Sequence, residues 1–168
     1  MDQTQIALAV ESLVPTAQYS RCDTYQALED SWTDARPIPT EADIIAAAPT
    51  NLKQEKKKKN KAIDKKTREI IKSGFQFAGK QFSLSGNAQR TLTGAYVAKD
   101  NPAFVYPLEW NTIDNEDKIE LDNASTLEAF YLTAVGTVRA IRESGTALKN
   151  QVRDATTIAE VFDVEDNR

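Results

Sequence analysis

The 168-residue sequence contains no histidine. Because histidine is the side chain most often used as an acid, base or metal ligand near neutral pH, its absence excludes Ser-His-Asp and Cys-His catalysis and histidine-containing zinc sites. Paired carboxylates are plentiful, but they fall in segments typical of turns, helix starts and the tail, whereas a catalytic pair needs a desolvated cleft. Residues 114–117 lack the spacing and the distal glutamate of a calcium loop. The scattered glycines form no phosphate-binding loop. The sequence therefore predicts a protein that is not an enzyme and has no catalytic residue, cofactor site or metal site.

Cysteine is nearly as scarce, since Cys22 is the only one. A single cysteine excludes an intramolecular disulfide and a thiolate metal cluster, and we expect Cys22 to be a small structural residue. This usage is typical of a protein made in a reducing cytoplasm. The N-terminus lacks the features of a signal peptide, and no apolar run approaches the roughly 20 residues that a membrane span needs. We therefore expect no membrane span.

The charges are unevenly distributed, although the net charge is only −4. Residues 1–50 carry eight acidic and two basic residues, residues 53–72 carry ten basic and three acidic residues, and residues 73–168 carry fourteen acidic and nine basic residues. This pattern indicates two acidic modules joined by a basic connector. A piece of about 50 residues buries too little surface to be stable by itself, so the first module is expected to pack on the rest of the chain or on a partner.

Short elements are predicted in the N-terminal module. Apolar residues at helical spacing indicate a helix over residues 4–14, which Pro15 ends. Residues 17–32 mix polar residues with spaced aromatic and aliphatic ones, and we expect two short strands there. Thr40 is predicted to cap a helix that stops at Pro49.

The basic connector is predicted to be helical from residue 52 to residue 73, with Gly74 as its C-terminal cap. Its first half has almost no apolar face, so we expect a solvated or frayed helix there. The C-terminal module begins with alternating apolar residues that indicate a β-hairpin: Phe75, Phe77, Phe82 and Leu84. A helix near residues 86–98 and strands over 104–110 and 118–121 are predicted to follow.

The final third of the chain is predicted to be mainly helical. Ser125 and Glu128 have the spacing of a capping box, and a thin heptad-like apolar stripe follows them. The stripe consists of Leu127, Tyr131, Ala134, Val138, Ile141, Gly145, Leu148 and Val152. A bend is expected near Gly145, where the stripe is weakest. Thr157 and Glu160 indicate the start of a last short helix.

These elements predict an α+β fold with three parts. Residues 1–50 are expected to form a small α/β docking module, and residues 51–73 the basic helical connector. Residues 74–168 are expected to form a domain of short antiparallel strands with a long helix.

The run Lys56-Lys57-Lys58-Lys59 is the first candidate for interaction with a partner. A basic cluster attracts nucleic acid through its phosphate groups. However, no aromatic residues interleave these lysines, and both flanking modules are acidic. A basic helix that packs against acidic neighbours is therefore the favoured interpretation, and nucleic acid is the less favoured partner.

The other candidate interaction residues are Trp32, Arg36 and Pro37 in the first module and Trp110 in the second. Tryptophan and arginine are enriched at interface hot spots. Burial in an ordinary core is the simpler explanation for each tryptophan.

Several short motifs in the C-terminal two thirds of the chain allow a comparison with a known family. They are Ile63-Asp64 with the helix that follows, Gly74-Phe75-x-Phe77-x-Gly79-Lys80-x-Phe82-Ser83-Leu84-Ser85 with Ala88-Gln89, Tyr106-Pro107-Leu108-Glu109-Trp110, the helix from Leu127, and Leu148-Lys149-x-Gln151-Val152 with Ala155-Thr156-Thr157. Together they resemble a domain of unknown function found in tail and tail-fibre-associated proteins of tailed bacteriophages. The segment Trp32-x-Asp34-x-Arg36-Pro37-x-Pro39-Thr40 is similar to a linker that often precedes such domains.

The resemblance implies a structural role in the virion, since the family has no assigned catalytic residues. We expect an adaptor or accessory subunit at the baseplate or at a tail fibre, because the sequence lacks the long β-repetitive shaft of a full fibre. Its partners would be other tail or fibre proteins, and it would be multimeric in the assembled particle after assembly in the host cytoplasm. A tail-fibre assembly chaperone, absent from the mature virion, is the alternative. A nucleic-acid-binding protein that uses the lysine-rich segment is a less favoured one.

Overall fold

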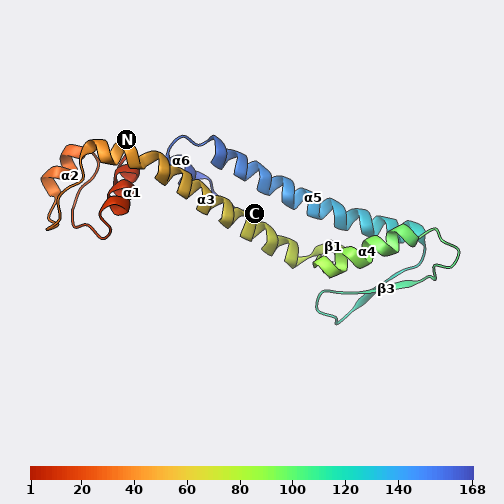
Figure 1. Ribbon diagram of the computed structural model, residues 1–168. Helices are drawn as coiled ribbons and strands as arrows, with labels where there is room; N and C mark the ends of the chain where they lie inside the picture. The colour runs from red at the N-terminus through yellow and green to blue at the C-terminus, as the bar shows by residue number, and fades with distance from the viewer. The chain divides into compact units, whose positions relative to one another are not determined.

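The computed structural model describes residues 1–168 and confirms the α+β class. Its helices are α1 (Gln3–Leu13), α2 (Tyr25–Ser31), α3 (Glu41–Ser73), α4 (Gly86–Ala98), α5 (Ala124–Asp154) and α6 (Ile158–Asp163) (Figure 1). Its strands form two antiparallel pairs, β1 (Phe75–Phe77) with β2 (Lys80–Phe82) and β3 (Leu108–Asn111) with β4 (Lys118–Leu121). The chain divides into two compact units, residues 1–63 with 147–167 and residues 64–146 with Arg168. Helices α3 and α5 contribute residues to both units.

The first unit begins with α1, whose N-terminus is closed by a capping box. The Asp2 carboxylate accepts the backbone N–H of Gln5 at 2.8 Å, and the Gln5 side chain accepts the N–H of Asp2 at 3.1 Å. The predicted helix over residues 4–14 is therefore confirmed, and it ends before Pro15. Its buried face joins α2 and the start of α3 in one apolar core, which consists of Ile6, Ala9, Val10, Cys22, Leu28 and Ile44.

The two strands expected within residues 17–32 are absent, and that prediction is wrong. The Thr24 hydroxyl accepts the N–H of Ala27 at 3.1 Å and starts helix α2. Only an isolated bridge between Tyr19 and Trp32 has strand-like pairing. A capped helix satisfies its own backbone groups, whereas an isolated two-stranded hairpin is marginally stable in water.

Helix α3 does not end at Pro49 as predicted but continues through it to Ser73. A proline inside a helix costs about 3 kcal/mol, because it removes one hydrogen bond and its ring clashes with the preceding turn. Here the helix is held on both sides of Pro49, by buried Ile44 before it and by buried Glu55 and Ile63 after it. Burial on both sides offsets the cost of the proline, and one continuous helix results.

A second apolar cluster in the first unit joins the middle of α3, the end of α5 and α6. It consists of Ile63, Val152, Ala155, Val161 and Val164. Helix α6 starts with the predicted capping box, in which the Thr157 hydroxyl accepts the N–H of Glu160 at 3.2 Å and the Glu160 carboxylate accepts the N–H of Thr157 at 3.3 Å. The last short helix is therefore confirmed.

The second unit contains the predicted hairpin, with Phe75 opposite Phe82. The turn residues Ala78 and Gly79 have φ angles of 49° and 77°, the positive values of a type I′ turn. Phe75, Phe82 and the following Leu84 are buried, and Phe77 is half-buried. The predicted alternation is therefore confirmed, with Phe77 at the edge of the core.

Phe130 on α5 is the centre of the core of the second unit. Its ring centroid lies 5.0 Å from that of Phe75, 5.1 Å from Phe77, 4.9 Å from Phe82 and 5.8 Å from Trp110. All four contacts are tilted or edge-to-face, which the aromatic quadrupole favours. One helical residue thereby holds both hairpins against α5.

The strand expected over residues 104–110 is shorter than predicted, since β3 covers only Leu108–Asn111. The N–H of Phe104 donates to the carbonyl of Asn101 at 2.8 Å and closes a turn in front of it. Strand β4 lies where it was predicted and places Ile119 opposite Trp110.

Helix α5 begins with Asn123 as its cap, so the predicted capping box of Ser125 and Glu128 is wrong. The Asn123 side chain accepts the N–H groups of Ser125 and Thr126, each at 3.0 Å. Asparagine is among the best N-cap residues, and with Asn123 as the N-cap, Ser125 lies inside the helix and does not cap it. The helix continues without a break past Gly145.

Candidate protein-interaction surfaces

Two of the four consecutive lysines bind the ends of helices within the first unit. The Lys56 ammonium donates to the carbonyl of Arg153 at 2.8 Å, in the last turn of α5. The Lys59 ammonium donates to the carbonyl of Phe162 at 3.2 Å, at the end of α6. Carbonyl groups at a helix C-terminus lack intrahelical partners and carry partial negative charge, so a cation stabilises them. These two lysines therefore have a structural role.

The remaining lysines of the segment have different environments. Lys58 forms an ion pair with Glu55, with 2.5 Å between ammonium and carboxylate. Lys57 is exposed and lies between exposed Lys53 and Lys61 at spacings of four residues, so the three form one row along α3. None of the three forms an ion pair. Like charges at this spacing destabilise a helix, by roughly 0.2–0.5 kcal/mol a pair. We call Lys53, Lys57 and Lys61 the lysine row.

The first half of the connector is better packed than the sequence predicted. Its lack of an apolar face indicated a solvated or frayed helix, yet Asn51 and Glu55 are buried and Leu52 and Lys56 are half-buried. Polar residues with long aliphatic stems or short amides fill the positions that apolar residues occupy in an ordinary amphipathic helix. This is why a hydrophobic pattern did not identify the buried face.

Trp32 and Arg36 make contacts within the first unit, between the segment that follows α2 and the segment that follows α1. The Trp32 ring stacks on Tyr19, with 6.2 Å between centroids and 1° between planes, and its indole N–H donates to the carbonyl of Arg36 at 2.9 Å. The Arg36 guanidinium pairs with Asp34 at 2.7 Å and donates to the carbonyl of Pro15 at 3.0 Å. Hydrogen bonds from the guanidinium and the backbone N–H of Arg36 hold the pKa of the Asp34 carboxyl well below its usual range.

Pro37, the third predicted residue of this group, is exposed. Trp110 is half-buried in the second unit and contacts Phe130 in the aromatic core. The structure thus gives Trp32, Arg36 and Trp110 internal packing roles. Their contact with a partner stays a prediction.

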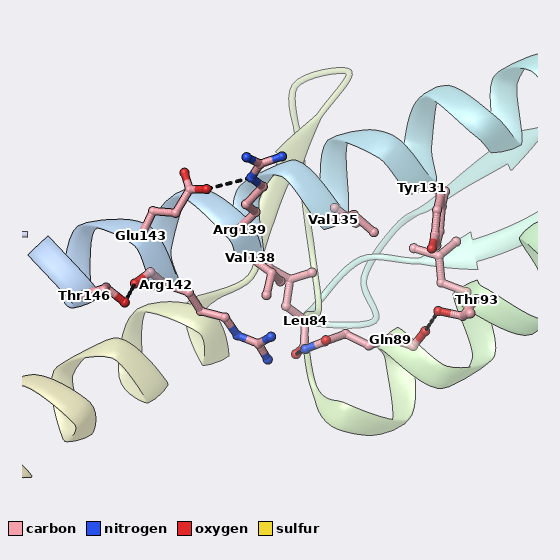
Figure 2. Close-up of a pocket in the computed structure, with 12 residues that line it drawn as sticks. Leu84, Gln89, Thr93, Tyr131, Val135, Val138, Arg139, Arg142, Glu143 and Thr146 are labelled. Carbon is pink, nitrogen blue, oxygen red and sulfur yellow. Dashed lines mark hydrogen bonds and ion pairs between the residues drawn. The ribbon is translucent and has the colours of Figure 1, made fainter.

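An apolar groove lies in the second unit, between α4 and α5. It has a volume of about 370 Å³. Buried residues form its floor: Leu84, Leu92, Ala134 and Val138. Exposed and half-buried residues form its sides and mouth: Gln89 and Thr93 from α4, and Tyr131, Val135, Arg139, Arg142, Glu143 and Thr146 from α5 (Figure 2).

Local hydrogen bonds attach α4 to the end of the first hairpin, and one ring contact joins α4 to α5. The Ser85 hydroxyl caps α4 by accepting the N–H of Ala88 at 3.2 Å. The Gln89 side chain donates to the carbonyl of Leu84 at 2.7 Å and fixes the end of the hairpin to the first turn of α4. Further along the helix, Tyr96 stacks on Tyr131 with 4.0 Å between centroids. The start of α4 is therefore fixed by the hairpin, and its later part by the ring contact with α5.

Apolar surface continues from the groove onto the outside of α5. Val135 lines the groove and is 45% exposed, and Leu132 precedes it by three residues and is 54% exposed. Residues three apart in a helix lie on the same face. The two side chains therefore widen the apolar surface beyond the groove itself.

The charges at the groove mouth are basic on balance. Arg139 pairs with Glu143 at 2.7 Å, one turn along α5. Arg142 is exposed, and its guanidinium forms no hydrogen bond or ion pair with another residue. Figure 2 shows its side chain extended beneath α5, on the side of Leu84 and Gln89. Arg142 is thus a free cation beside an apolar surface.

Sequence reasoning identified one edge of this groove and missed the rest. Tyr131, Ala134 and Val138 belong to the predicted apolar stripe, and they line the groove. Val135 and Arg142 lie outside that stripe and were not singled out. No local pattern marks Val135 and Arg142, because the groove forms only where residues of α4 and α5 lie side by side.

The structure contains no group of three or more Cys, Asp or Glu side chains that could hold a metal ion. None of its helices is both long enough and apolar enough to span a membrane.

The family described as a domain of unknown function, DUF4376, matches residues 54–166. The match covers more than half of the chain, and the chain belongs to this family. The whole groove lies within the matched residues. No curated protein and no solved structure matches the chain.

Proposed function

We propose that this DUF4376-family chain is a non-enzymatic structural component of a bacteriophage tail that acts through contacts with other tail proteins. Its place would be the baseplate or a fibre attachment point, as an adaptor or accessory subunit. The resemblance of the hairpin and helix motifs to tail-associated domains supports this assignment. Residues 1–50 would serve as a docking module toward a partner in the virion.

The groove between α4 and α5 is the observation that carries the protein-binding part of the proposal. A soluble domain normally covers a recessed apolar floor of this kind, or leaves it open for a ligand or a partner. The neighbouring Leu132 and Val135 add apolar side chains that remain exposed. Interfaces typically have such an apolar centre with polar residues around it, as Gln89, Thr93 and Arg139 are here.

The lysine segment supports a structural role more than a nucleic-acid-binding one. Lys56 and Lys59 are engaged with helix carbonyls, and Lys58 is engaged with Glu55. Only part of the basic run therefore remains free to contact phosphate groups, and no aromatic residue accompanies it for base stacking.

Quantitative mass spectrometry of purified particles of the phage that encodes the chain tests the proposal. We expect the chain to be present in a fixed ratio to known tail proteins and to stay after washing at high salt. Its absence from mature particles, together with its presence in lysates beside a fibre protein, would contradict the structural role. That result would assign the chain to fibre assembly as a chaperone.

A further inference from the structure

The groove has the length and the walls of a site for a helix. Its α5 side extends from Tyr131 to Thr146, which corresponds to roughly 22 Å, or about four helical turns. On the other side, Gln89, Leu92 and Thr93 of α4 line the groove, so parts of two helices border it (Figure 2). A groove between helices is the usual receptor for an amphipathic helix, whose side chains at i, i+3 or i+4, and i+7 enter it.

The floor of the groove selects apolar anchors. Leu84, Leu92, Ala134 and Val138 present no polar atom from their side chains, and all four are buried. A volume of about 370 Å³ holds a small number of large side chains. A small polar ligand would find no buried charged or hydrogen-bonding side chain on this floor.

The mouth of the groove selects negative charge. Arg142 has no partner, while Arg139 is already paired with Glu143. A carboxylate next to an apolar anchor would form a charge-assisted pair with the Arg142 guanidinium, which can bind it with two parallel hydrogen bonds. A lysine or arginine at the same place would be repelled.

We infer that the groove binds an acidic amphipathic helix of another protein, with apolar anchors against Leu92 and Val138 and a carboxylate against Arg142. This rests on the proposed function as a protein-docking subunit and specifies the chemistry of the partner. A second copy of this chain fits less well. In a two-fold symmetric contact the same patch faces itself, which would bring Arg142 of each copy toward the basic mouth of the other.

Selection from a library of helical peptides tests the inference. The library is selected on the immobilised full-length chain, with counterselection on the Val135→Glu variant, which changes an exposed residue at the groove. We expect the enriched peptides to have apolar residues at i, i+3 or i+4, and i+7, with Asp or Glu beside them. A labelled enriched peptide should bind the Val135→Glu variant at least tenfold more weakly.

Charge exchange then tests the role of Arg142. Arg142→Glu should weaken binding of the acidic peptide about tenfold, and a peptide with lysine in place of its acidic residues should regain affinity for this variant. Val97→Glu is the matched control, because Val97 is 79% exposed on α4 and does not line the groove. It should change affinity by less than twofold.

Three results would overturn the inference. One is enrichment of peptides that bind Val135→Glu as well as they bind the unchanged chain. Another is enrichment without an excess of acidic residues. The third is a dimer of the chain that Val135→Glu dissociates, which would make a second copy the occupant.

A chain that is present in particles but fails these binding tests would refute the helical partner and leave the proposed function intact. A chain that binds such peptides but is absent from particles would refute the tail role alone.

Discussion

Replacement of Phe130 by alanine should destabilise the second unit more than any other single change on α5. Phe130 is fully buried, and four aromatic rings from the two hairpins surround it at 4.9 to 5.8 Å. Truncation of a buried phenylalanine costs roughly 3–5 kcal/mol. The surrounding rings are attached to paired strands and cannot move far into the cavity, so we expect about 4–5 kcal/mol, near the upper end.

The matched control is Leu132→Ala, two residues further along the same helix. Leu132 is 54% exposed, so its truncation should change the free energy of unfolding by less than about 0.5 kcal/mol. Phe130→Leu keeps an apolar side chain at the site and should cost about 1.5–3 kcal/mol, less than Phe130→Ala. This variant keeps the series measurable if the alanine variant does not fold.

Urea unfolding followed by tryptophan fluorescence measures this series. Trp110 lies 5.8 Å from Phe130, so its emission reports on the second unit in a Trp32→Phe background. We expect Phe130→Ala to move the Trp110 transition to lower urea, while Leu132→Ala leaves it nearly unchanged. Equal shifts for the two variants would refute the aromatic core centred on Phe130.

Three further changes test other parts of the structure. Gly74→Ala should destabilise the second unit by more than about 1 kcal/mol, because Gly74 has a φ of 90° and an added Cβ would lie on the carbonyl of Phe82. Gly136 lies in open space within α5, so Gly136→Ala should stabilise the unit by about 0.5–1 kcal/mol. Thermal unfolding that shifts in the same direction for both variants would contradict this. Lys57→Glu replaces two like-charge pairs of the lysine row with two opposite-charge pairs, so it should raise the free energy of unfolding by roughly 0.5–1 kcal/mol at low salt. An increase that persists at 1 M salt would point to another cause. Hydrogen bonds from the backbone and hydroxyl of Thr156 and from the backbone of Thr157 lower the pKa of the Glu160 carboxyl. Because the folded pKa is the lower one, this contribution to stability is complete above the unfolded value of about 4.3 and is lost as the pH falls through the folded pKa, so Glu160→Gln should flatten the acid limb of the urea-midpoint profile monitored at Trp32.

Local patterns predicted most helices and both hairpins correctly. Alternation identified the first hairpin through Phe75 and Phe82, and helical spacing placed α4 at residues 86–98. These elements have an apolar face and clear turn or capping residues. Their local preferences agree with the contacts that they make in the folded chain.

The errors occurred where tertiary contacts outweigh local preference. Pro49 marked a helix end in the sequence, but burial on both sides keeps α3 continuous. The polar face of α3 around Glu55 is buried, and a hydrophobic pattern gave no sign of it. The use of Lys56 and Lys59 as partners for helix carbonyls 97 and 103 residues away also depends on contacts that no local pattern contains. The groove was missed for the same reason, because it forms only when α4 lies beside α5.

The most direct test of the central proposal measures how much of the chain remains in purified particles when the groove is altered. Phage that carries Val135→Glu in this chain is compared with phage that carries Val97→Glu, an equal change at an exposed apolar residue outside the groove. Quantitative mass spectrometry gives the amount of the chain relative to other tail proteins. We predict that Val135→Glu strongly reduces the amount of the chain in particles, and that Val97→Glu leaves it unchanged. Equal retention of the two variants would contradict the proposal that the groove binds this chain to the tail.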